Sequence, residues 1–196
     1  MILFSGIMTW KAYVTELFID TDCISAFLWV DNQALLPKIF PGKIIMPLPV
    51  YRELSRPQVS HLKQRVDSMI ERGYISVESL TFGTPEYREY VSMINGNDPE
   101  FTVVGKGEAS AIAFAKERDG VLGSNNLKDI MQFVKAYNLK FLTTGDLLVM
   151  AYEKGLISEA EGNEIWEKML RRRRKLGADS FSSYLSLKRR IVADIV

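Results

Sequence analysis

The sequence predicts an α/β fold, with a five-stranded parallel sheet sandwiched by helices. Short apolar segments rich in β-branched and aromatic residues alternate along the chain with longer segments of helical periodicity. This alternation indicates parallel strands joined by right-handed helical crossovers. A chain of 196 residues with 47% apolar residues is near the size of one domain and can bury a hydrophobic core.

Three of the strands are expected in the N-terminal half, where local signals mark the first strand and the helices that follow. Residues 13–19 (YVTELFI) are rich in side chains that favour a strand. Pro47 and Pro49, after the second strand, suit the first turn of a helix. Apolar residues at helical spacing then predict a helix that Gly73 ends. The expected order is strand 13–19, helix 22–30, strand 43–46, helix 50–54, helix 59–72 and strand 74–77.

The C-terminal half is expected to add two strands and most of the helices. Thr84 and Pro85 predict an N-cap and the first helical position, and Ser158 with Glu161 fits a capping box. The expected order is helix 85–94, helix 108–118, strand 120–123, helix 127–137, strand 139–142, helix 146–154 and helix 158–174. An appendage after Gly177 is expected to dock through Phe181, Tyr184, Leu185 and Ile191.

We expect a body at residues 1–160 and a helical extension at 161–196 packed on the same domain. Residues 1–10 are apolar, lack a basic n-region and are too short to span a bilayer, so we expect no secretory signal. Met8 is an alternative start. No apolar run approaches membrane length, which predicts a cytoplasmic protein without a membrane partner.

The composition excludes several kinds of site. The net charge of +1 creates no global field toward nucleic acid or anionic lipid, so any such affinity must be local. The one cysteine, Cys23, rules out a disulfide framework and a four-cysteine zinc site. The one histidine, His61, rules out a multi-histidine metal site. We expect Cys23 to be a buried thiol and His61 a surface residue.

Three acids far apart in sequence are candidates for one site. Asp20 follows the first strand, and Glu53 and Glu108 each lie near the start of a predicted helix. Ligands of open α/β sheets bind beyond the carboxyl ends of the strands, where such acids would meet. Each acid also has an ordinary explanation, as a helix cap or as a complement to a helix dipole. Together they suit Mg²⁺ or Mn²⁺, which prefer oxygen ligands.

In order and spacing, five segments resemble the PIN domain family of metal-dependent ribonucleases. They are FIDTDCIS (18–25), PLPVYRELSR (47–56), GKGEASAIAFAKERDG (105–120), VLGSNN (121–126) and TTGDLLVMAYEKGLIS (143–158). The resemblance covers about residues 13–160. It implies Mg²⁺- or Mn²⁺-dependent hydrolysis of RNA, with Asp20, Glu53 and Glu108 as the acids at the family's motif positions. Many members are the toxins of toxin–antitoxin pairs, so an antitoxin protein is an expected partner.

The chain departs from the family after the fourth strand, where an aspartate is common and Asn125-Asn126 stand instead. An amide oxygen can ligate a cation, but the lost charge weakens binding. Asp129 follows one helical turn later and would supply a carboxylate, or it is an ordinary surface acid. The hypothesis is that Asp20, Glu108 and either Asn126 or Asp129 hold the cation, while Glu53 orients the attacking water.

The densest basic run is formed by Arg171, Arg172, Arg173 and Arg174, followed by a lysine. It is a candidate grip on an RNA backbone. The alternative is charge complement at the C-terminal end of a helix.

The sequence is therefore compatible with three functions. The first is a metal-dependent ribonuclease, as the toxin of a toxin–antitoxin pair. The second is a catalytically impaired module of the same fold that binds RNA or a protein partner. The third is a phosphatase of the haloacid dehalogenase type, because Asp20-Thr21-Asp22 is an Asp-x-Asp after a strand. That chemistry normally needs a later acidic pair, and Asn125-Asn126 does not provide one. Under any of these functions, a homodimer is a further expected assembly.

Overall fold

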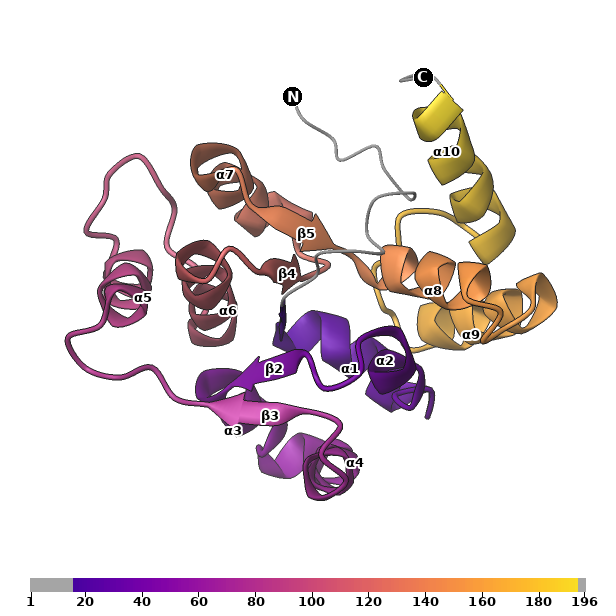
Figure 1. The fold of residues 1–196 in the computed structure, drawn as a ribbon, viewed down its shortest axis with the longest axis horizontal. Helices are drawn as coiled ribbons and strands as arrows, with labels where there is room; N and C mark the ends of the chain where they lie inside the picture. Colours follow the sequence, from indigo (N-terminus) through magenta and orange to yellow (C-terminus); the bar gives the residue numbers. More distant parts are fainter. Residues whose placement is uncertain (1–15, 194–196) are drawn as a thin grey trace.

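A five-stranded, all-parallel sheet lies at the centre of the protein, in the order β3-β2-β1-β4-β5 (Figure 1). The computed structural model describes residues 16–193, and the start of the predicted first strand and residues 1–10 lie outside that range. The strands are β1 (Leu17–Ile19), β2 (Ile44–Pro47), β3 (Ser76–Glu78), β4 (Val121–Gly123) and β5 (Lys140–Leu142). The predicted fold class is therefore confirmed.

The helices connect successive strands and then continue past the sheet at the C-terminal end. They are α1 (Thr21–Trp29), α2 (Leu35–Ile39), α3 (Leu48–Leu54), α4 (Ser60–Glu71), α5 (Pro85–Asn95), α6 (Lys106–Glu117), α7 (Leu127–Tyr137), α8 (Thr144–Glu153), α9 (Glu159–Arg171) and α10 (Phe181–Ala193). A short 3-10 turn, Pro57–Val59, precedes α4. Thr84 caps α5, and Ser158 with Glu161 forms the capping box of α9, as the sequence predicts.

Two hydrophobic cores cover opposite faces of the sheet, because successive strand side chains point to opposite sides. Leu17 and Ile19 of β1 face the larger core, which α1–α4 and α8–α10 supply. Phe18 faces the smaller core beneath α5–α7, where its ring stacks on Phe114 with centroids 5.5 Å apart. Figure 1 shows these two helical layers on either side of the strands.

One helix was not predicted, and another ends earlier than predicted, each for a local reason. Helix α2 was not predicted, because Pro37 reads as a breaker, yet it lies in the first turn of a helix that buries Leu36 and Ile39. Helix α9 ends at Arg171, short of the predicted residue 174, and Arg173 takes a left-handed conformation with φ 56°. The chain therefore turns within the basic run.

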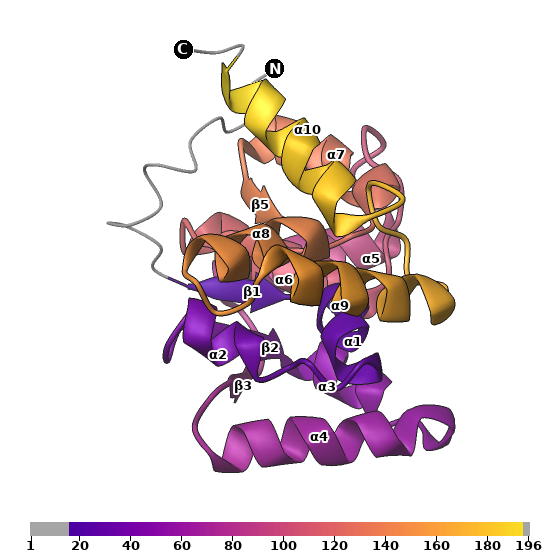
Figure 2. The same ribbon diagram turned by 90° about the vertical axis from the view of Figure 1, so that its right-hand side faces the viewer.

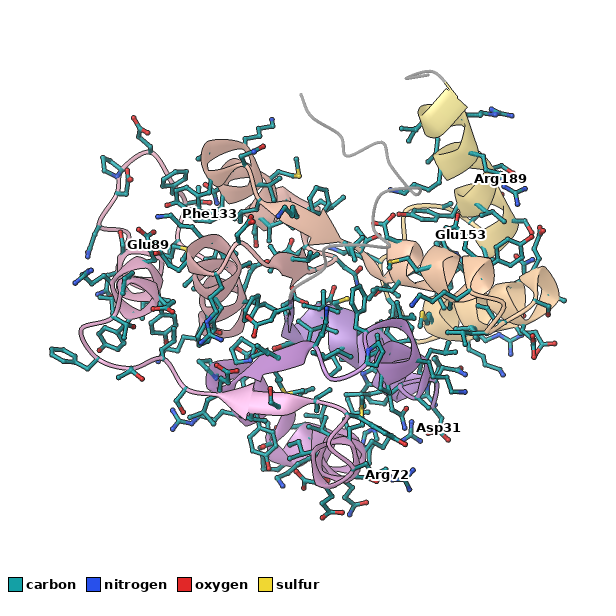
Figure 3. All side chains as sticks on the ribbon, in the orientation of Figure 1. Asp31, Arg72, Glu89, Phe133, Glu153 and Arg189 are labelled. Atoms are coloured by element: carbon teal, nitrogen blue, oxygen red, sulfur yellow. The ribbon has the colours of Figure 1, made fainter. Side chains whose placement is uncertain are left out.

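Helix α10 docks on α8 and α9, as Figure 2 shows. Phe181, Tyr184 and Leu185 are buried in the larger core, as the sequence predicts, and Ile191 is half-buried. Phe181 lies so close to Gly162 that a Cβ there would meet its ring at 2.4 Å. Figure 3 labels Glu153 on α8 and Arg189 on α10. Burial raises the pKa of Glu153, and the positive charge of Arg189 partly opposes this.

Within residues 16–193, no helix has both the length and the apolar character needed to cross a membrane. Cys23 is fully buried, as predicted. His61 is exposed, as predicted, and its ring packs against Trp29 with centroids 4.7 Å apart.

Candidate active site

Asp20 lies at the carboxyl end of β1 and is almost completely buried. Its Oδ1 accepts a 2.7 Å hydrogen bond from the Cys23 backbone N–H, which caps α1. Burial raises its pKa to about 7, partly opposed by hydrogen bonds from the Ser124 side chain and the Cys23 backbone. Asp20 therefore acts as the N-cap of α1, but only Oδ1 takes part in the cap.

Glu108 lies in the first turn of α6 and is half-buried. Burial is the main reason that its pKa rises to about 8, and the negative charges of Asp20 and Asp129 raise it further. A hydrogen bond from the Asn126 side chain acts in the opposite direction. Glu108 therefore lies within electrostatic range of both Asp20 and Asp129.

Glu53 of α3 links the two chain segments that carry these acids. The Thr21 hydroxyl, next to Asp20, donates to Glu53 Oε2, and the Gly107 N–H, next to Glu108, donates to Oε1 at 3.0 Å. A Cβ at Gly107 would meet Glu53 Oε2 at 2.8 Å, so the glycine allows this close approach. We call Asp20, Glu53, Glu108 and Asp129 the acid site.

The two asparagines after β4 have different roles. Asn125 turns toward α8, where it exchanges two hydrogen bonds with Thr144, from the Thr144 N–H at 2.8 Å and to its Oγ1 at 2.7 Å. Asn126 faces the acid site, where its Nδ2 donates to Asp129 Oδ2 at 2.7 Å. Only the amide nitrogen can donate, so the same NH₂ group also serves Glu108.

Comparison with known proteins agrees with this arrangement. A family model described as a PIN domain matches residues 16–189, which is most of the chain. The chain belongs to the PIN domain family. No curated protein matches the chain significantly. The family match sets aside the haloacid dehalogenase alternative. PIN domains have a nuclease-type fold and generally use divalent metal ions.

The acids of this PIN domain do not form a ready three-ligand cage. Among residues 16–193, no group of three or more His, Cys, Asp or Glu side chains is arranged to hold a metal ion. The carboxylates accept hydrogen bonds from protein donors: Glu53 from Thr21 and Gly107, Asp129 from Asn126, and one oxygen of Asp20 from the Cys23 N–H. No ion pair within the same residues involves any member of the acid site.

The predicted basic run splits into separate environments. Arg171 is exposed and pairs with Glu167 one turn away at 2.6 Å. Arg172 lies over the Trp29 ring, 5.3 Å from its centroid. Arg174 reaches the PIN domain's acidic edge, where its NH1 lies 3.3 Å from Asp22 Oδ1 and 3.4 Å from Ser25 Oγ. Arg173 is exposed in the turn after α9.

Sequence reasoning missed three supporting residues. Ser124 is fully buried between Asp20 and Asn126, accepting a 3.3 Å hydrogen bond from the Asn126 N–H. Thr21 and Gly107 hold Glu53 in place. Their positions carried a signal, since a small hydroxyl residue at a strand end and a glycine before a helical acid both adjoin predicted site residues.

Proposed function

We propose that this PIN domain is a divalent-metal-dependent ribonuclease that hydrolyses RNA phosphodiesters, with Asp20 and Glu108 as its main metal ligands. The observation that carries the proposal is the state of these two acids. Asp20 is almost completely buried and Glu108 is half-buried, both have pKa values raised by burial and by neighbouring negative charge, and neither has an ion-pair partner in the described part of the chain. Such a pair is stabilised by an added cation.

The donor set suits Mg²⁺ or Mn²⁺. Mg²⁺ keeps several waters and needs only one or two carboxylates with substrate phosphate, so a complete protein cage is not required. Asn126 Oδ1 is a further oxygen donor beside Glu108, while Asp129 is available if its bond to Asn126 opens. When bound, the cation supplies charge stabilisation at the phosphate and acidifies a water.

Other residues of the chain have positioning roles. Glu53 is fixed from both sides by Thr21 and Gly107, so its carboxylate is oriented in advance to accept a proton from a water near Asp20. Asn126 holds Glu108 and Asp129 together through its NH₂ group. This rigid frame fits hydrolysis, which depends on exact placement of water and phosphate.

Cleavage of a labelled single-stranded RNA with and without Mn²⁺ tests the proposal. We expect Mn²⁺-dependent cleavage that Asp20→Asn lowers at least about 100-fold, since Asn keeps the helix cap but not the charge. Asp179→Asn, at an exposed acid, is the matched control and should cleave as the wild type does. Cleavage that survives in Asp20→Asn would contradict the assignment. A toxin role, with an antitoxin as partner, would add growth arrest on expression that Asp20→Asn relieves.

A second candidate function is a metal-poor PIN module that binds RNA or a protein without cleaving it. The amide at Asn126 and the lack of a three-ligand group among residues 16–193 favour it. No Mn²⁺ binding to the wild type by calorimetry, together with retained RNA binding, would establish this alternative.

Arg174 is the member of the basic run that we expect to contact RNA phosphate near the acid site. Its guanidinium is the one held at the first turn of α1, close to Asp20. Arg174→Gln should weaken RNA binding and lower the slope of log K against log salt by about 0.7, the loss of one phosphate contact on a single strand. Arg174 pairs with Asp22 on α1, whereas Arg171 is exposed and pairs with Glu167 within its own helix, so Arg171→Gln is the control and should change the slope less. Equal slopes in both variants would contradict this role.

A further inference from the structure

The segment between β3 and α5 exposes the aromatic ring of Phe82 to solvent instead of burying it in a core. Phe82 is 86% exposed, which is unusual for a large apolar side chain. Its ring contacts Tyr87 edge to face, with centroids 5.3 Å apart, and Tyr87 lies 6.4 Å from Tyr90. Phe82, Tyr87 and Tyr90 therefore form a continuous series, which we call the aromatic row.

The turn that carries Phe82 is ordered by hydrogen bonds on both sides. Thr84 Oγ1 donates to the Thr81 carbonyl at 2.9 Å and accepts from the Tyr87 N–H at 3.3 Å. The Arg88 guanidinium donates to the Gly83 carbonyl at 3.2 Å. The ring is thus presented to solvent by a defined turn at the start of α5, so it is available for stacking at a small entropic cost.

The charges around the aromatic row favour an anionic partner. The acids of α5 face α6, where Glu89, labelled in Figure 3, pairs with Lys116 at 2.5 Å and Glu86 lies 3.7 Å from Arg118. Arg88, on the exposed side of α5, has no ion pair within residues 16–193. The outward surface of α5 therefore combines aromatic rings with an unneutralised positive charge.

The aromatic row leads to the acid site. Tyr90 is half-buried, and the charges of Arg52 and Glu53 on α3 act on its hydroxyl, so this end of the row lies within electrostatic range of α3. Arg52 is exposed and, within the described residues, has no ion pair. The row thus runs from the exposed Phe82 through Tyr87 to Tyr90, and Tyr90 is the member within electrostatic range of Glu53.

We propose that the aromatic row is a base-stacking subsite for single-stranded RNA, with Phe82 as the outer platform and the strand running along α5 toward the acid site. This inference rests on the proposed function, since it assigns the path by which the substrate reaches that site. Bases of a single strand offer free faces to aromatic side chains, whereas a duplex hides them. Arg88 and Arg52 would meet the phosphates between stacked bases.

Binding of a labelled oligoadenylate in EDTA, where no metal-dependent cleavage occurs, tests the subsite. Phe82→Ala should weaken binding about tenfold, and Phe82→Tyr should restore it, because stacking needs only a ring. The salt slope should stay unchanged in Phe82→Ala but fall by about 0.7 in Arg88→Gln. Leu187→Ala, which removes another exposed apolar side chain, on α10, is the control and should bind as the wild type does.

Three results would overturn the subsite: affinity of Phe82→Ala within about twofold of the wild type, an equal loss on duplex RNA, or a change of oligomeric state in Phe82→Ala. The last result would assign the ring to a protein interface instead. The outcome is separable from the nuclease proposal, because the affinity is measured without metal. Loss of binding in Phe82→Ala would support the subsite even if Asp20→Asn left cleavage unchanged.

Discussion

Replacing Glu108 by Gln is expected to abolish metal-dependent RNA cleavage and, at the same time, to raise the melting temperature of the metal-free protein at pH 8. The loss of activity should be at least about 100-fold, because the variant removes a main metal ligand. The gain in stability has an electrostatic origin. Glu108 is half-buried beside Asp20 and Asp129, so its ionised form is unfavourable in the folded state.

The pH dependence follows from the raised pKa values. The pKa of Glu108 rises from 4.5 to about 8, and that of Asp20 from 3.8 to about 7. Between the unfolded and folded pKa values, these two acids bind more protons in the folded state than in the unfolded state. Their contribution to stability is therefore greatest below about pH 4 and falls as pH rises toward 8. Glu108→Gln should remove the share of this decline that Glu108 contributes.

Thermal melts in EDTA at pH 4.5 and pH 8 measure this effect. The melting temperature of Glu108→Gln should exceed that of the wild type by about 3 °C or more at pH 8, and by less than about 1 °C at pH 4.5. Glu164→Gln, at an exposed position of α9, is the control and should show no pH-dependent difference. A variant that is less stable than the wild type at pH 8 would contradict the described electrostatics. Added Mn²⁺ should stabilise the wild type at pH 8 but not Glu108→Gln.

Replacing Asn126 by Asp is expected to raise the affinity for Mn²⁺ about tenfold or more and to destabilise the metal-free protein. The substitution adds a carboxylate beside Glu108 and Asp129 and removes the NH₂ group that serves both. Without metal, the added charge repels both acids. With metal bound, the new carboxylate would serve as a further ligand.

Calorimetric titration with Mn²⁺ and melts in EDTA measure both effects of Asn126→Asp. Asn125→Asp is the matched control, because Asn125 faces Thr144 rather than the acid site. It should leave the Mn²⁺ affinity unchanged. Equal gains in affinity for the two variants would show that net charge alone, and not the position of Asn126, sets metal binding.

Much of the fold could be predicted because its signals are local. Alternating apolar strands and helical periodicity led to the parallel sheet, and Thr84 and Ser158 marked helix starts that the structure confirms. Helix α2 could not be predicted, because a proline such as Pro37 either ends a helix or lies in its first turn, and the sequence alone does not decide which. The end of α9 depends on the left-handed conformation of Arg173. Non-glycine residues seldom adopt this conformation, so the sequence gives no signal for it.

The candidate site could be predicted only in part. Asp20 and Glu108 stand at recognisable places, a strand end and a helix start, and the topology brings them together. The hydrogen bond from Thr21 to Glu53 joins residues 32 positions apart, so no local pattern reports it. The direction of the Asn125 side chain depends on Thr144, 19 positions along the chain, so no local pattern separates Asn125 from Asn126.

A crystal of the protein soaked in Mn²⁺, with diffraction measured at the manganese absorption edge, tests the central claim most directly. We predict an anomalous peak within about 2.0–2.6 Å of carboxylate oxygens of both Asp20 and Glu108, the range of bonds between hard cations and oxygen. A peak elsewhere, or none at saturating Mn²⁺, would contradict the claim that these buried acids form a metal site.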